Sequence, residues 1–167
     1  MSKKVGALVF ISNSNGQVFM GRKTGKIGIG KYTGPGGKCE VGETPPETAV
    51  RETREETEVK LVASDLIKVA EITFHNGPDS EFLVHIFTTT KYQGESQDSE
   101  EMVKGQWFNI SDLIANPRQV EMMAGDYTFL PLILSDQKIR GWCKYQPGSN
   151  QGIVLDCHYD IVSSFSD

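Results

Sequence analysis

The sequence predicts an α+β fold in which strands outnumber helices. Segments rich in β-branched and aromatic residues recur along the chain and are bounded by Gly, Pro, Asn or Asp, which is typical of strands. They do not alternate regularly with helical segments, so a doubly wound parallel sheet is not expected. With 167 residues, 38% of them hydrophobic, and no repeat or long linker, residues 1–167 are expected to form one domain.

Each element follows from a local pattern. Strands are predicted at residues 4–11, 17–21, 66–74, 82–92, 105–108, 139–145 and 152–162. Residues 33–38 are too rich in glycine for a regular element and are predicted to form a loop whose backbone approaches a ligand closely. A short helix is predicted to begin at an N-cap formed by Ser111 and to run through Ala115. Another is predicted at 127–134, followed by a polar connection at 135–137.

The remaining helix is predicted to begin at Thr44. Thr44, two prolines and Glu47 fit a capping box, in which the hydroxyl and the carboxylate each accept a backbone N–H. The middle of this helix carries only Ala49 and Val50 as apolar residues, so ordinary core packing does not account for its stability. A solvated surface helix is the simplest interpretation of such a charged segment.

Three carboxylates on this helix argue for a function instead. Glu52, Glu55 and Glu56 lie on one face within about one turn. Like charges so placed destabilise an isolated helix by a few tenths of a kcal/mol per pair, so a positive partner is expected. Arg51, one turn before Glu55, is close enough to hold that carboxylate by an ion pair. Mg²⁺ is usually bound by one or two carboxylates, waters and substrate phosphates, so the cluster and the glycine-rich segment suggest a metal-assisted phosphate site.

Composition excludes several other classes of protein. The net charge of −5, with six glutamates against two arginines in residues 43–58, disfavours a nucleic-acid-binding protein. No segment approaches the roughly 18 apolar residues of a membrane span, and the N-terminal apolar run lacks a cleavage site. Cys39, Cys143 and Cys157 are odd in number and lack metal-binding spacing. A reduced, cytoplasmic compartment is therefore expected.

The segment from Gly37 to Glu56 resembles the sequence signature of the Nudix hydrolases, which act on nucleoside diphosphates linked to another moiety. The resemblance implies an α/β/α sandwich with a mixed central sheet, and a Mg²⁺ cofactor for which Mn²⁺ can substitute. The family has a glycine near the end of this helix where the present chain has Glu58. The matching residues are Gly37, Glu43, Arg51, Glu52, Glu55 and Glu56.

The segments around this signature are similar to the MutT-type purine nucleoside triphosphate diphosphatases of the same family. The similar segments are residues 21–23, 28–34, 36–38, 101–102, 107–108, 129–134 and 141–142. They imply conversion of a purine nucleoside triphosphate, such as 8-oxo-dGTP, to monophosphate and pyrophosphate by a monomer or homodimer. Two alternatives stay open: another Nudix substrate such as a nucleotide sugar, and a catalytically silent nucleotide-sensing module.

The resemblance also implies roles for individual residues at the metal site. Glu56 or Glu101 is expected to be the general base, and the catalytic set also includes Arg51. Such a metal neutralises phosphate charge and lowers the pKa of a water molecule. The expected metal ligands are the carbonyl of Gly36 and the carboxylates of Glu52, Glu55, Glu56 and Glu101, with Glu100 as a substitute for Glu101.

A second set of residues is expected to contact the substrate. Lys23 and Lys38 are candidates for contact with the phosphates, and Gly36 and Gly37 are also expected to contact the substrate. The MutT-type enzymes read the purine with an asparagine and two adjacent aspartates, and stack it on a tryptophan. The present chain has Thr33, Gly125 followed by Asp126, and Met123 at these places, and Phe74 matches an apolar pocket position.

Overall fold

The computed structural model describes residues 2–25 and 28–165. Three α-helices and nine strands are found in these residues, together with short 3₁₀ turns at Ala63–Asp65 and Pro117–Gln119. The helices are α1 (Pro45–Thr57), α2 (Ile110–Ala115) and α3 (Asp126–Leu134). The strands are β1 (Ser2–Ile11), β2 (Gln17–Lys23), β3 (Tyr32–Thr33), β4 (Gly36–Lys38), β5 (Ile67–His75), β6 (Ser80–Thr89), β7 (Met102–Asn109), β8 (Lys138–Tyr145) and β9 (Val154–Val162).

The strands form two sheets. The larger sheet has the order β4-β1-β6-β5-β8-β9, and the smaller one has the order β3-β2-β7. In the larger sheet β1 pairs with β6 and β5 pairs with β8 in parallel, whereas the other neighbours are antiparallel. The predicted mixed central sheet is therefore confirmed.

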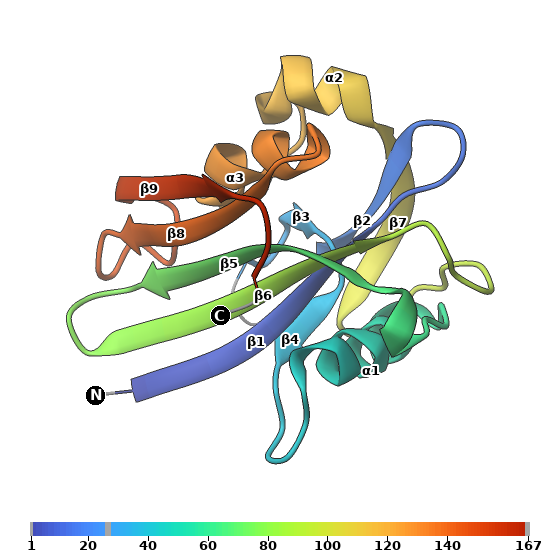
Figure 1. Cartoon of the computed structure of the whole chain (residues 1–167), viewed down its shortest axis with the longest axis horizontal. Coiled ribbons are helices and arrows are strands. Elements are labelled where there is room, and N and C mark those ends of the chain that lie inside the picture. Colours follow the sequence, from blue (N-terminus) through green and yellow to red (C-terminus); the bar gives the residue numbers. More distant parts are fainter. Residues whose placement is uncertain (1, 26–27, 166–167) are drawn as a thin grey trace.

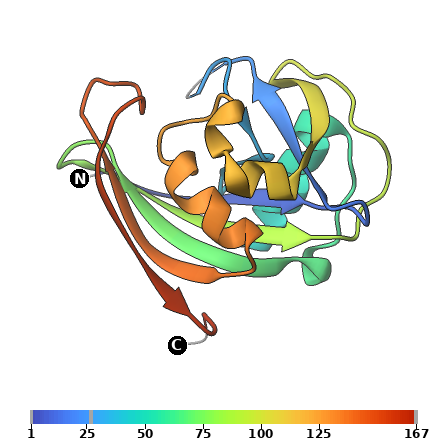
Figure 2. The same cartoon turned by 90° about the horizontal axis from the view of Figure 1, so that it is seen from above.

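Helices cover both faces of this sheet, as an α/β/α sandwich requires. In β1, Val9 and Ile11 enter the hydrophobic cluster that contains Ala49 of α1, whereas Leu8 and Phe10 enter the cluster formed with α2 and α3. Alternate residues of a strand point to opposite faces, so β1 is buried on both sides. Figure 1 shows α1 against β1 and β4, and Figure 2 shows α2 and α3 together within the curve of the large sheet.

Helix α1 begins as predicted and packs in a way that the sequence pattern did not suggest. Thr44 is its N-cap, and both hydrogen bonds of the capping box with Glu47 are present. The buried face is made of Ala49 and threonines rather than large apolar residues. The hydroxyls of Thr53 and Thr57 each donate to the carbonyl four residues earlier, at 2.7 Å, so this polar face is buried without unpaired hydroxyls.

Two local predictions were wrong. Residues 33–38 are not a loop throughout, because Tyr32–Thr33 pairs with β2 and Gly36–Lys38 pairs with β1. Ser111 is not the N-cap of α2, because the Asn109 side chain accepts the N–H of Asp112 in that role. Asn and Ser are both strong capping residues. Because Asn109 and Ser111 lie only two residues apart, the sequence alone does not show which of them begins this short helix.

The other predicted strands and the helix at 127–134 are present, with bounds shifted by a few residues. The longest shifts are of three residues: β7 extends from Met102 rather than from residue 105, and β6 ends at Thr89 rather than at residue 92. None of the helices in the described part of the chain is long and apolar enough to cross a membrane.

The end of α1 offers a test of backbone strain. Glu58 is the C-cap, with a left-handed φ of 66° and ψ of 0°. A side chain in this region is disfavoured by contact between Cβ and the backbone, whereas glycine has no Cβ. We therefore expect Glu58→Gly to raise the free energy of unfolding by about 1 kcal/mol, measured by urea denaturation. If Glu58→Gly instead lowered the free energy of unfolding by a similar amount, the Glu58 side chain would stabilise the helix end by more than its left-handed backbone conformation destabilises it.

Candidate active site

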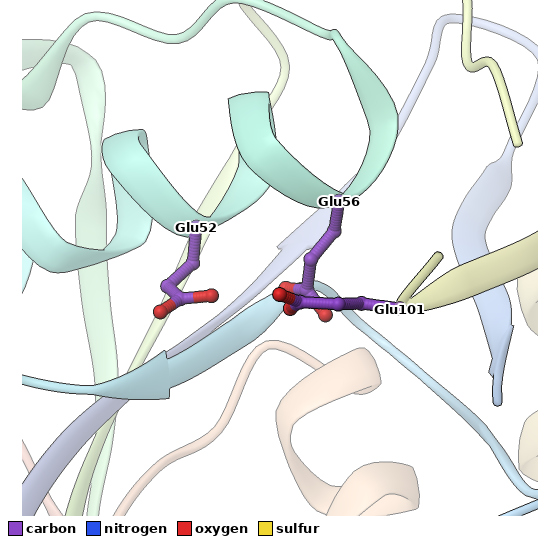
Figure 3. Close-up of side chains that lie close together, drawn as sticks. All are labelled: Glu52, Glu56 and Glu101. Atoms are coloured by element: carbon purple, nitrogen blue, oxygen red, sulfur yellow. The ribbon is translucent and has the colours of Figure 1, made fainter. Parts of the chain in front are cut away.

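Three carboxylates from two distant parts of the chain meet beside α1. Glu52 and Glu56 extend from the helix, and Glu101, the residue immediately before β7, extends toward them (Figure 3). One oxygen from each of the three lies within 4.8 Å of the others. The spacing of Glu52 and Glu56 is that of adjacent turns of one helix face, whereas Glu101 is brought in by the packing of β7.

Glu56 is the most buried member of this group. Its side chain is 3% exposed, and its Oε1 accepts the N–H of Gly36 at 2.9 Å. Burial, with a smaller contribution from the negative charges of Glu52 and Glu101, raises the pKa of Glu56 to about 7. The hydrogen bond from Gly36 and the charge of Lys23 act in the opposite direction. A positive charge placed among these carboxylates would relieve this penalty.

The β4 glycines allow the backbone to approach the carboxylates closely. In the ladder between β4 and β1, Val9 donates to Pro35 and Cys39 donates to Val5, so the polar groups of Gly36 point away from β1. The N–H of Gly36 is used by Glu56, and its carbonyl is directed to the same side. A Cβ on Gly37 would lie 2.6 Å from the Glu52 carboxyl carbon, so a side chain here would displace that carboxylate from its present position.

Arg51 holds the carboxylates of α1 in place. Its guanidinium binds Glu43 through two hydrogen bonds, of 2.7 and 3.0 Å, and Nη1 donates to Glu52 at 2.9 Å. The hydrogen bonds from Arg51 lower the pKa of Glu43 to about 2. The predicted ion pair with Glu55 is present, at 3.2 Å. Glu55 itself is half exposed and lies outside the group of three carboxylates, so its role as a metal ligand stays a prediction.

The donor set fits a hard divalent cation. Carboxylate oxygens are the ligands that Mg²⁺ and Mn²⁺ prefer, and the group has no basic side chain among its three members. We expect Glu52→Gln, Glu56→Gln and Glu101→Gln each to weaken Mn²⁺ binding at least about tenfold, measured by calorimetry. Glu55→Gln is the matched control on the same helix, and we expect it to change the affinity by less than about threefold. Equal losses in all four variants would place Glu55 in the metal site.

A cavity of about 310 Å³ is lined by Glu56 and by Asp126, which lies in the first turn of α3. Lys23 also lines it, and its charge lowers the pKa of both Glu56 and Asp126. The wall is mainly apolar, with a few polar side chains. The remaining lining residues include Lys4, Thr33, Gly36, Gly37, Phe74, Asn76, Phe82, Met123, Phe129, Tyr145 and Gln151.

Two buried oxygens in this cavity lack a partner among the described residues. They are Oδ2 of Asp126 and Oγ1 of Thr33, whose residues are 3% and 4% exposed. Complete burial raises the pKa of Asp126 to about 7, and the charge of Lys23 offsets part of this effect. Leaving a buried polar atom unpaired costs about 1–3 kcal/mol. Such groups persist where a ligand completes their hydrogen bonds.

The structure brings most of the predicted site residues to one place. Lys38 is an exception, because its side chain is exposed and only its carbonyl takes part, accepting Nη2 of Arg51 at 3.2 Å. Tyr145 lines the cavity but was not among the site residues predicted from the sequence. It lies within an ordinary strand pattern, and only the pairing of β8 with β5 brings it beside Phe74 and the cavity.

The raised pKa values imply that the metal-free protein loses stability as pH rises. The folded chain holds protons on Glu56 and Asp126 up to about pH 7, whereas the unfolded chain releases them near pH 4. The free energy of unfolding should therefore fall between about pH 4 and pH 7, by on the order of a few kcal/mol in total. Burial lowers the pKa of His85, which acts in the opposite direction near pH 6.

Urea denaturation in EDTA at pH 5, 6 and 8 measures this dependence. Glu56→Gln removes one of the carboxyls whose pKa is raised by burial, so its stability should vary less over the same range. A wild-type stability that rises from pH 5 to pH 8 would contradict the assignment.

Comparisons with known proteins agree with this geometry. The NUDIX domain family model matches residues 2–132. The chain is 36% identical over 112 residues to the oxidized purine nucleoside triphosphate hydrolase of Danio rerio, which covers 66% of this chain and 67% of that protein. It is 33% identical over 131 residues to the protein of the same name from Mus musculus, covering 78% of each.

The fold is also similar to that of solved structures. The crystal structure of a MutT protein from Bacillus halodurans superposes with a TM-score of 0.76 at 24% identity, covering 94% of this chain and 97% of that one. The resemblance seen in the sequence is thereby confirmed, and the chain belongs to the Nudix hydrolase family.

Proposed function

We propose that this Nudix hydrolase converts a purine nucleoside triphosphate, including oxidised forms such as 8-oxo-dGTP, to the monophosphate and pyrophosphate. One observation carries the proposal: Glu56 belongs both to the carboxylate group and to the wall of a cavity that Asp126 also lines. A nucleotide bound with its phosphates near Glu56 would place its base near Asp126. The names of the Danio rerio and Mus musculus relatives support this substrate class.

The chain's own residues would divide the work along this cavity. A bound Mg²⁺ supplies charge neutralisation for the phosphates and a water of lowered pKa. Glu52, Glu56, Glu101 and the carbonyl of Gly36 would hold it, and Arg51 would position the Glu52 carboxylate. Lys23 would contact the phosphates. We assign the general base to Glu56 rather than Glu101, because Glu56 lines the cavity as well as belonging to the carboxylate group.

The recognition of the base would depend on hydrogen bonds rather than on apolar contact alone. The unpaired oxygens of Thr33 and Asp126 are buried in the cavity, beside Phe74 and Met123. A site built to form hydrogen bonds rejects an analogue that leaves those groups unpaired far more strongly than an apolar wall does, where one methylene is worth about 1–3 kcal/mol. We therefore expect the chain to discriminate between bases.

A substrate panel tests the proposal directly. Pyrophosphate release is measured with Mg²⁺ for dGTP, dATP, 8-oxo-dGTP, dCTP and dTTP, with nucleotide sugars included in the same experiment. We expect pyrophosphate from purine triphosphates. Products from nucleotide sugars alone would assign another Nudix substrate class, and binding without turnover of any compound would indicate a nucleotide-sensing module.

Two further assignments accompany this function. We extend the domain over residues 1–167, which is supported by the place of β8 and β9 in the large sheet beyond the matched segment. The three free cysteines support a cytoplasmic location. The choice between monomer and homodimer stays a prediction.

A further inference from the structure

Gly125 lies at the start of α3, where the backbone conformation does not require a glycine. Its φ of −65° and ψ of −31° are ordinary right-handed helical values, which any residue adopts. The space around it is what excludes a side chain. A Cβ at this position would lie 2.3 Å from the hydroxyl oxygen of Tyr145, and 3.1 Å from the ring carbon that carries it. The glycine therefore keeps a place open for the Tyr145 hydroxyl.

The Tyr145 hydroxyl is fixed in this place from two sides. Its oxygen accepts the N–H of Gly125 at 3.1 Å. Its ring stacks on that of Phe74, with centroids 6.0 Å apart and an interplanar angle of 16°. Tyr145 is 3% exposed and lines the cavity. A side chain held by stacking and by a backbone N–H loses little further freedom when a ligand binds.

The hydroxyl still has a proton to donate. In the described part of the chain its only hydrogen bond is the one in which it accepts from Gly125. Burial and the nearby charge of Asp126 raise the pKa of Tyr145, so the group stays a protonated donor at neutral pH. Asp126 follows Gly125 directly, and its unpaired Oδ2 is an acceptor that also lines this end of the cavity.

We propose that Tyr145 is a specificity-determining residue, whose hydroxyl donates a hydrogen bond to the 6-carbonyl of a guanine-type base. In the same complex, Asp126 accepts the hydrogen bond of the neighbouring ring N–H. Because Asp126 directly follows Gly125, whose N–H binds the Tyr145 hydroxyl, the two residues offer one donor and one acceptor to the same cavity. A lactam edge, with an N–H beside a C=O, is their complement, whereas adenine presents a ring nitrogen beside an amino group. The inference rests on the proposed function, because it assumes that the base occupies this end of the cavity. It adds that the pocket selects guanine-type bases, oxidised or not.

The test compares dGTP with 6-thio-dGTP in wild-type protein and in Tyr145→Phe. The thio analogue keeps the ring N–H but replaces the carbonyl oxygen by sulfur, which is a weak acceptor. We expect Tyr145→Phe to raise KM for dGTP about tenfold with little change in kcat, and to change KM for 6-thio-dGTP by less than about threefold. The effect on 8-oxo-dGTP should equal that on dGTP, since both carry the same 6-carbonyl.

Tyr159→Phe is the matched control. The Tyr159 hydroxyl is also largely buried but bonds to Oγ1 of Thr128 at 2.7 Å, and Tyr159 does not line the cavity. We expect KM for both nucleotides to be unchanged in this variant, and thermal unfolding reports any loss of stability in either one. An equal rise of KM for both nucleotides in Tyr145→Phe would overturn the inference, as would no rise at all.

Gly125→Ala tests the same hydroxyl without removing it. The added Cβ must displace the Tyr145 oxygen, so KM for dGTP should again rise more than KM for 6-thio-dGTP. Combining it with Tyr145→Phe should add little to the single effect, since both changes act on one group. Independent, additive losses would contradict the shared origin. A wild-type protein that hydrolyses no nucleoside triphosphate would refute the proposed function itself, which separates the two failures.

Discussion

Glu56→Gln is expected to lower kcat at least about 100-fold while the fold is retained. Glu56 is the one member of the carboxylate group that also lines the cavity, so it is placed both to hold a metal and to accept a proton. Glutamine has nearly the same shape and can still accept the N–H of Gly36 through its carbonyl oxygen. What it loses is the negative charge and the ability to take up a proton.

The same substitution should make the metal-free protein more stable at pH 8. Burial raises the pKa of Glu56 to about 7, so at pH 8 the fold contains a charge that it disfavours. A neutral side chain removes that cost. Steady-state kinetics at saturating Mg²⁺, with urea denaturation in EDTA at pH 8, measure both effects on one preparation. A rise in stability with a loss of turnover is the combination expected of a functional carboxylate.

Glu58→Gln is the control for this experiment, because Glu58 is an exposed glutamate two residues further along the chain. We expect its kcat to stay within about twofold of the wild-type value. Unchanged turnover in Glu56→Gln would transfer the role of base to Glu101. Lost turnover that excess Mn²⁺ restores would indicate that Glu56 acts as a metal ligand only.

The local features of this fold were predictable from the sequence. The capping box at Thr44 and Glu47, and the carboxylates of Glu52 and Glu56 on one face, depend on residues three or four positions apart. Helical geometry relates such residues without any knowledge of the rest of the chain. Glu101 was different, since only the resemblance to the family placed it near the helix, and the structure brings it there through β7.

The features that sequence reasoning missed depend on contacts between distant segments. Gly36 and Gly37 read as a loop because nothing nearby shows that β1 pairs with them. In the sequence Tyr145 is indistinguishable from any other strand residue. Its proposed role depends on Gly125, which lies twenty residues earlier in the chain and beside it in space. That contact depends on the register of β5 with β8 and on the path of the chain before α3. Neither feature can be predicted from a local sequence pattern.

Asp126 lines the same cavity as Glu56 but does not belong to the carboxylate group, so Asp126→Asn should separate recognition of the base from chemistry. Its Oδ2 is buried without a partner among the described residues, so an ionised Asp126 offers an acceptor to an N–H of the base. Asparagine can accept the same N–H only through its amide oxygen and without the negative charge, and in its other orientation the amide N–H₂ faces a second donor. We expect kcat/KM for purine triphosphates to fall about 100-fold, with most of the change in KM.

The stability of Asp126→Asn distinguishes this role from a structural one. Burial raises the pKa of Asp126 to about 7, above its ordinary value near 3.8, so the folded state disfavours the ionised form. The cost appears as pH rises through the interval between these values and is complete above pH 7. Removing the charge should therefore raise the free energy of unfolding at pH 8 and change it little at pH 4.

Asp79→Asn, an exposed position in the turn between β5 and β6, should change neither stability nor KM. If Asp126→Asn lost stability at pH 8 while KM stayed the same, the carboxylate would serve the fold and not the substrate. A gain in stability together with a higher KM is the result expected if the fold tolerates an unfavourable buried charge because the bound base makes use of it.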